Sequence, residues 1–176
     1  IARGEFTLRF QPQVNREFRL DGLEVLLAWK HPQLGSVQPE LFIRLAEEIG
    51  AILPIGDWVI EQTCLQIAAW RKAGFAPPRI AVNVSAIQFA SPDFVDQVRA
   101  ILARTGISGD ALEFEITEST ILRDVNESAA RMDELRALGI SLAIDDFGVG
   151  YSPLAYLQSL PLDVVKVDRA FIEQIT

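Results

Sequence analysis

Two kinds of hydrophobic pattern alternate along the chain. Short runs rich in Val, Ile, Leu and Phe are typical of buried β-strands, whereas longer stretches with periodic apolar residues are typical of helices. The short runs predict strands over residues 6–14, 23–29, 79–85, 112–119, 141–147 and 164–171. The longer stretches predict helices over residues 39–50, 55–74, 92–106 and 126–139. Each of these helices ends at a glycine, which readily adopts the left-handed conformation that closes a helix.

The order of these elements predicts an α/β fold with a mostly parallel sheet. Helices separate the last four predicted strands, which is the pattern of βαβ units. The first two strands are too close in sequence for a helical crossover, so we expect them to pair antiparallel. No linker-like stretch divides the 176 residues, which predicts one domain over residues 1–176. Because the first residue is Ile1 rather than Met, we expect the chain to be a piece of a longer protein.

The composition narrows the partners that this domain can have. The formal net charge is −8, whereas a protein that binds duplex nucleic acid normally presents a basic face, so we expect no such binding. A small anionic ligand is compatible with this charge if cations are bound locally. Cys64 is the single cysteine, which excludes an internal disulfide and favours a cytoplasmic location. No apolar run is long enough to span a membrane, which leaves open an anchor elsewhere in the parent protein.

Polar residues with coordinating or charged groups interrupt five of the predicted strands. These residues are Glu24, Asn83, Glu115, the adjacent pair Asp145 and Asp146, and Lys166. Three of them, Asn83, Glu115 and Asp145, lie near the carboxyl ends of their strands, where parallel β/α folds assemble their sites. Converging carboxylates repel one another unless a cation binds between them, and Mg²⁺ or Mn²⁺ prefers oxygen ligands. The pattern therefore predicts two divalent cations of the kind that catalyse phosphoryl transfer.

Each of these residues also has a plain structural interpretation. Asp145 and Asp146 are suited to cap the turn before the glycines of FGVG, and Asn83 is suited to cap the next helix. Glu24 is suited to the exposed face of an edge strand. Glu115 is suited to an ion pair with a surface arginine, and Lys166 is suited to point outward, as most lysines do. The shared placement in five strands favours one common site over separate coincidences. The only histidine, His31, is interpreted as a turn residue.

These residues make the chain resemble the EAL domain family, the bacterial phosphodiesterase modules that act on cyclic di-GMP. The matching stretches, in family order, are FQPQV, LEVLLAWKHP, VQPELFIRLAEEIG, AVNVSAIQF, LEFEITES and AIDDFGVGYSPLAYLQSLPLDVVKVDRAF. The signature Glu-Ala-Leu reads Glu24-Val25-Leu26 in this chain. The resemblance implies a TIM-like (β/α)₈ barrel with one antiparallel strand. Only about six strands are present in this chain, so we expect the EAL-like domain to be incomplete at both ends.

The resemblance also implies a role for each candidate residue. The ligands of two Mg²⁺ or Mn²⁺ ions would be Glu24, Asn83, Glu115, Asp145 and Asp146. Lys166 would lie beside the cations and help to hold the water, so that it forms the catalytic group with Glu24 and Asp145. Gln11 would contact a guanine, and Glu118 would anchor the loop after the double aspartate without binding metal. The reaction implied is metal-assisted hydrolysis of one phosphodiester bond of cyclic di-GMP, which gives pGpG.

Three departures from the family pattern bear on activity. Ala28 stands where the family usually carries a phosphate-binding arginine, and we expect Lys30, on the same strand face, to compensate in part. Val149 and Pro153 replace a threonine and a serine in the loop after Asp146. The chain also stops after six predicted strands, where a complete barrel has roughly 250 residues. We therefore expect the missing strands to continue beyond this piece, and the piece alone to show little or no turnover.

Three functions are consistent with this sequence. The matching ligand set favours a cyclic di-GMP phosphodiesterase of bacterial signalling, expected as a homodimer with cyclase or sensory domains in the same polypeptide. The alternative is a catalytically degenerate EAL domain that acts as a cyclic di-GMP receptor or regulatory module, favoured by Val25, Ala28 and Val149. A purely structural dimerisation domain ranks last, because it leaves the acidic residues unexplained. Metal-dependent turnover separates the first two functions, and ligand binding separates the last two.

Overall fold

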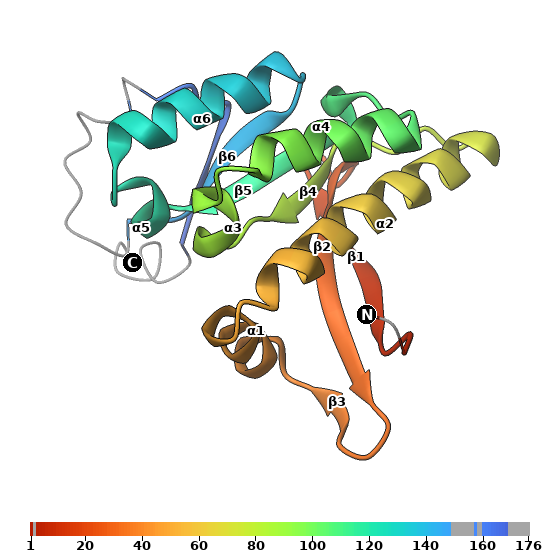
Figure 1. The fold of residues 1–176 in the computed structure, drawn as a ribbon. Helices are drawn as coiled ribbons and strands as arrows, with labels where there is room; N and C mark the ends of the chain where they lie inside the picture. Colours follow the sequence, from red (N-terminus) through yellow and green to blue (C-terminus); the bar gives the residue numbers. More distant parts are fainter. Residues whose placement is uncertain (2, 149–156, 158–159, 169–176) are drawn as a thin grey trace, which may run out of the picture.

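The computed structural model describes residues 1, 3–148, 157 and 160–168. Its centre is a seven-stranded sheet in the order β1-β2-β4-β5-β6-β7, with β3 paired to β2 (Figure 1). The strands are β1 Phe6–Val14, β2 Leu20–His31, β3 Gly35–Val37, β4 Ile80–Asn83, β5 Leu112–Thr117, β6 Ser141–Phe147 and β7 Val164–Val167. The neighbours β2, β4, β5, β6 and β7 pair parallel, whereas β1 and β3 run antiparallel to β2.

Helices lie in the connections from β3 to β4, from β4 to β5 and from β5 to β6. They are α1 Pro39–Glu48, α2 Ile52–Lys72, α3 Ala86–Ala90, α4 Phe94–Thr105, α5 Glu118–Ile121 and α6 Val125–Ala137, with a 3₁₀ turn at Gly109–Ala111. Figure 1 shows α2 and α4 crossing in front of the sheet, where they pack against each other. Glycine closes α4 as expected, because Gly106 is its C-cap with φ 67°. Among the described residues, no helix is long and apolar enough to cross a membrane.

Strand β5 shows how the packing of the core positions polar side chains. Leu112, Phe114 and Ile116 are fully buried on one face of this strand, and the Phe114 ring lies 5.9 Å from the ring of Phe94 on α4. Burial of side chains of this size stabilises the fold by about 1.5–3 kcal/mol each. Because side chains alternate along a strand, Glu115 projects from the opposite face. The same alternation that fills the core therefore directs an acid away from the helices.

The structure confirms the expected fold class and adds short elements to it. All six predicted strands are present, and the predicted bounds 6–14 and 141–147 agree with β1 and β6. Strand β3 and helices α3 and α5 were not predicted, because elements of three to five residues have no measurable hydrophobic period. Of the last predicted strand, residues 164–167 form β7, and residues 169–171 lie outside the described residues.

Candidate functional site

Four strands bring three carboxylates to a single lysine. The Nζ atom of Lys166 on β7 lies 2.7 Å from Oε1 of Glu115, 3.5 Å from Oε2 of Glu24 and 3.7 Å from Oδ1 of Asp145. Asn83 on β4 joins this group, because its Nδ2 donates a hydrogen bond to Oε1 of Glu24 at 3.1 Å. The structure thus brings together five of the residues singled out in the sequence, while their catalytic and metal-binding roles stay predictions.

The register of the parallel strands explains this convergence. Asn83 is the direct partner of Glu115 across β4 and β5, and Asp145 on β6 is the partner of Thr117, two residues beyond Glu115. Glu24 on β2 is aligned with Ala81, two residues before Asn83. Directly opposed residues and residues two apart on a strand share one face of the sheet. Polar residues of four adjacent strands therefore meet on one face of the sheet, near the carboxyl ends of its parallel strands.

Burial and mutual repulsion set the electrostatics of this group. Glu115 is only 1% exposed, and burial raises its pKa to about 7 although Lys166 opposes this shift. Burial also disfavours the charge on Lys166, but contact with Glu115 and attraction by Asp145 and Glu24 raise its pKa above the usual value. Lys166 is therefore a protonated donor at neutral pH. Oε1 of Glu115 is held by the ion pair with Lys166, whereas Oε2 has no hydrogen-bond partner among the described residues.

Asp146 adopts a backbone conformation that differs from the rest of β6. Its φ is 54°, in the left-handed region that aspartate tolerates better than most residues. The register of β6 against β7 shifts at this point, between Ile144 and Phe147. Partial burial and the carboxylates of Asp145 and Asp168 raise the pKa of Asp146, so Asp146 shares the electrostatic environment of Asp145. We call Glu24, Glu115, Asp145 and Asp146 the acidic cluster.

Sequence reasoning did not single out Asp168, whose carboxylate contributes to this environment. The backbone N–H of Asp168 donates to the carbonyl of Phe147 at 3.2 Å, which continues the pairing of β6 with β7 by one residue. A signal was present in the sequence, because Asp168 lies two positions after Lys166 and strand residues two apart share a face.

Gln11 lies next to Glu24, and Glu118 contacts the backbone that follows Asp146. Gln11 on β1 is exposed and is the direct antiparallel partner of Glu24, so both residues lie on the same face of the sheet. Glu118, 5% exposed, is the first residue of α5, and its Oε2 accepts a hydrogen bond from the backbone N–H of Gly148 at 3.2 Å. Glu118 thus contacts the segment that follows the double aspartate. Contact of Gln11 with a guanine stays a prediction.

The acidic cluster and Asn83 offer the oxygen donors that a hard divalent cation prefers. The donors are carboxylates and one amide oxygen, which suits Mg²⁺ or Mn²⁺ better than zinc. Oε2 of Glu115 is buried without a hydrogen-bond partner among the described residues, as expected of a ligand that serves a cation. Within the described residues, no three Asp, Glu, His or Cys side chains are arranged to hold a metal ion. The donor chemistry fits the cations, and in this arrangement Lys166 supplies the positive charge.

Several of the plain structural interpretations are wrong. The N-cap of α3 is Ser85 rather than Asn83, since Ser85 Oγ accepts a hydrogen bond from the first turn of that helix. Glu24 does not lie on an edge strand, because β2 lies between β1 and β4. Glu115 forms its ion pair with Lys166 and not with a surface arginine, and the Lys166 side chain is only 26% exposed.

One departure from the family pattern, Ala28, lies on β2. Ala28 and Lys30 share the face of Glu24 by strand alternation, and Lys30 is exposed. The turn interpretation of His31 is confirmed, because its Nδ1 accepts hydrogen bonds from two backbone N–H groups of the β2–β3 turn at 3.2 Å. Val149 and Pro153 lie outside the described residues.

The fold is that of an EAL domain. The model of the EAL domain family matches residues 1–176, and the chain belongs to this family. The similarity extends to proteins of named function. MucR of Pseudomonas aeruginosa, described as a bifunctional diguanylate cyclase/cyclic di-GMP phosphodiesterase, is 43% identical over 176 residues, which are 99% of this chain and 26% of MucR. The oxygen sensor protein DosP of Escherichia coli is 41% identical over 175 residues, which are 99% of this chain and 22% of DosP.

Solved structures show the same architecture. The MucR phosphodiesterase in complex with c-di-GMP matches with a TM-score of 0.93 and 43% identity, over 99% of this chain and 71% of that chain. The crystal structure of the FimX EAL domain matches with a TM-score of 0.89 and 25% identity, over 99% of this chain and 70% of that chain. The chain spans about a quarter of the length of the relatives MucR and DosP.

Proposed function

We propose that this chain belongs to a cyclic di-GMP phosphodiesterase, which hydrolyses one phosphodiester bond of the cyclic dinucleotide to give pGpG. The convergence of Glu24, Glu115 and Asp145 on Lys166 is the observation that carries this proposal. Mutually repelling acids at one edge of a sheet are unfavourable unless cations offset them, and phosphodiester hydrolysis by two cations needs such a set. MucR, whose name includes this activity and whose phosphodiesterase was solved with c-di-GMP, supports the choice of substrate.

Some of these residues would bind the cations, and others would position water, substrate or backbone. Two Mg²⁺ or Mn²⁺ ions would be held by Glu24, Asn83, Glu115, Asp145 and Asp146. Bound there, the cations supply Lewis acidity and lower the pKa of water. Because its pKa is raised, Lys166 acts as a hydrogen-bond donor that orients water or a phosphate oxygen, and not as a general base. Glu118 holds the backbone at Gly148 in place. Gln11, the strand partner of Glu24, would contact a guanine of the substrate.

The proposal is tested by binding and turnover on the same sample. We expect the full-length protein to bind cyclic di-GMP and to release pGpG only when Mg²⁺ or Mn²⁺ is present. Excess EDTA should abolish pGpG formation, and an excess of Mn²⁺ should restore it. A sample that binds cyclic di-GMP but leaves it intact at every metal concentration would contradict the enzyme and favour a receptor.

The receptor function is the second candidate, and Ala28 is the observation that favours it. A methyl group cannot replace the bidentate contact of an arginine with a phosphate. We propose that Lys30, two residues further on the same face, supplies part of the missing charge. Lys30→Ala should then weaken cyclic di-GMP binding, and an unchanged affinity would contradict this compensation. The homodimer and the accompanying cyclase or sensory domains also stay proposals.

A further inference from the structure

Helix α3 is a five-residue helix that begins three residues after the candidate ligand Asn83. A helix this short cannot be stable by itself, because the cost of its first turn is not recovered. Its start is fixed locally: the backbone N–H of Val84 donates to the carbonyl of Glu115 at 3.0 Å, and Ser85 caps the first turn. The rest of α3 must therefore be held by its neighbours.

One neighbour is α2, through a contact between Gln88 and Gly56. Gln88 is 3% exposed, and its Nε2 has no hydrogen-bond partner among the described residues. A Cβ atom on Gly56 would lie only 2.1–2.2 Å from the Nε2, Cδ and Oε1 atoms of Gln88. Glycine weakens the interior of a helix relative to alanine, so its presence within α2 needs a packing reason. The reason here is the Gln88 amide, which lies directly against the α2 backbone.

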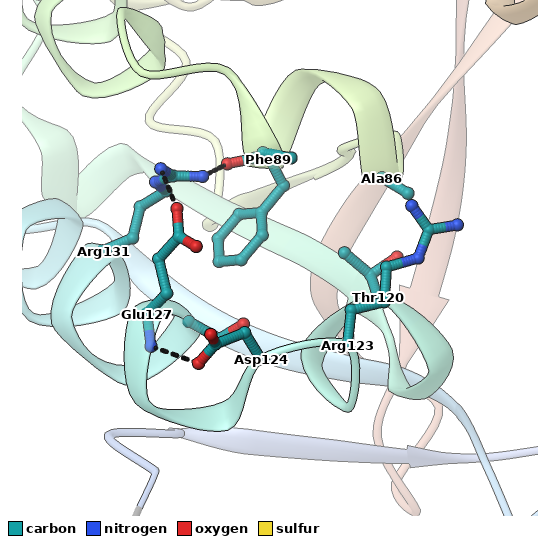
Figure 2. Close-up of a pocket in the computed structure, with 9 residues that line it drawn as sticks. Ala86, Phe89, Thr120, Arg123, Asp124, Glu127 and Arg131 are labelled. Carbon is teal, nitrogen blue, oxygen red and sulfur yellow. Dashed lines mark hydrogen bonds and ion pairs between the residues drawn. The ribbon is translucent and has the colours of Figure 1, made fainter.

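The second neighbour is α6, through Arg131. The Nη1 atom of Arg131 donates a hydrogen bond to the carbonyl of Phe89, and its guanidinium lies 5.6 Å from the centre of the Phe89 ring (Figure 2). Arg131 is held in turn by Glu127, whose Oε1 accepts from Nη2 at 2.9 Å. Figure 2 shows these side chains around a small cavity of about 60 Å³ between α3 and the α5–α6 segment. Helix α3 is therefore held by contacts with α2 through Gln88 and with α6 through Phe89.

We propose that Gly56, Gln88 and Arg131 are positioning residues for Asn83, an inference that rests on the proposed function. Asn83 is exposed, and its described side-chain hydrogen bond is made to Glu24, itself a candidate ligand. Its place in the cluster therefore depends on the backbone that leads into α3. An alanine at position 56 would displace the Gln88 amide, and because Gln88 is only 3% exposed we expect this displacement to be passed to α3 and to the backbone that leads into it.

The test is the affinity of the full-length protein for Mn²⁺ in the absence of substrate, followed by electron paramagnetic resonance of free Mn²⁺. Gly56→Ala should weaken Mn²⁺ binding by about 10-fold, the lower end of what loss of an outer support of a metal ligand produces. Gly56→Ala combined with Gln88→Ala removes the clash and should bind Mn²⁺ more tightly than Gly56→Ala alone. Turnover should show the same order among these variants.

A matched control lies further along α2. Ile67 is fully buried and eleven residues after Gly56, about 16 Å along the helix. Ile67→Val should lower the unfolding temperature and leave Mn²⁺ affinity within about twofold, because the two sites are too distant to couple. If Gly56→Ala does not fold, Arg131→Lys, which loses the second donor and keeps the charge, should weaken Mn²⁺ binding in the same direction.

The outcomes separate this inference from the proposed function. The positioning role alone would be overturned if the unsubstituted full-length protein bound Mn²⁺ and hydrolysed cyclic di-GMP while the folded Gly56→Ala and Arg131→Lys variants bound Mn²⁺ with equal affinity. If the unsubstituted full-length protein bound no Mn²⁺, the proposed function would be overturned, and the positioning role with it.

Discussion

Removal of the Lys166 ammonium should destabilise the protein in a way that divalent cations reverse. Loss of one partner of a buried ion pair costs about 3–5 kcal/mol. The Lys166 side chain is 26% exposed, whereas Glu115 is fully enclosed, so we expect the lower end, about 3 kcal/mol, for Lys166→Met. At about 2–4 °C per kcal/mol for a domain of this size, the unfolding midpoint should fall by about 6–12 °C in EDTA.

Saturating Mg²⁺ should reduce the difference in unfolding midpoint between Lys166→Met and the unsubstituted protein. A ligand present at about 100 times its Kd stabilises the native state by about 2.7 kcal/mol, so each protein gains stability according to its own affinity for Mg²⁺. The variant should gain more than the parent, because it has no ammonium that competes with the cation. Thermal unfolding followed by circular dichroism, with EDTA and then with Mg²⁺, measures both quantities.

The matched control for this experiment is Lys30→Met, the same replacement at an exposed lysine of β2. It should change stability by no more than about 0.5 kcal/mol, with or without Mg²⁺. The reasoning would be refuted if Lys166→Met were as stable as the parent in EDTA. It would also be refuted if the difference between them persisted unchanged in saturating Mg²⁺.

Three further predictions concern other parts of the chain. Burial raises the pKa of the Cys64 thiol to about 11, so a thiol reagent at pH 8 should modify Cys64 only as fast as the protein unfolds; rapid modification of the folded protein would contradict its burial. Glu118→Gln weakens a charge-assisted bond to the Gly148 backbone, so it should cost about 1 kcal/mol of stability and lower kcat, as thermal unfolding and turnover would show. Ala28→Arg restores a phosphate donor and should tighten cyclic di-GMP binding by about 10-fold or more by calorimetry. No gain would show that position 28 does not face the ligand.

The sequence was sufficient for the elements whose hydrophobic pattern is long. The bounds of β1 and β6 and the convergence of Glu24, Glu115 and Asp145 could be predicted, because parallel strands in register bring equivalent positions to one edge. It was not sufficient for α3, whose existence depends on contacts with α2 and α6 and not on its own five residues. The left-handed backbone of Asp146 was likewise beyond reach, since local propensity places aspartate in many turns.

The same division holds inside the site. The types of residue predicted a cation-binding cluster, but the distance of 2.7 Å between Lys166 and Glu115 depends on how β7 packs against β6. The contribution of Asp168 was missed because single acids after a strand are common, although its spacing from Lys166 indicates a shared face and the pairing of β6 with β7 brings it near Asp146.

Metal-dependent hydrolysis tests the central claim most directly. The full-length protein and its Asp145→Asn variant would be incubated with cyclic di-GMP over a range of Mn²⁺ concentrations, and the nucleotides would be separated by chromatography. The account predicts that the parent forms pGpG with a saturable dependence on Mn²⁺, and that Asp145→Asn, with one carboxylate fewer in the cluster, forms far less. Equal pGpG formation by the two proteins, or formation that EDTA does not prevent, would contradict it.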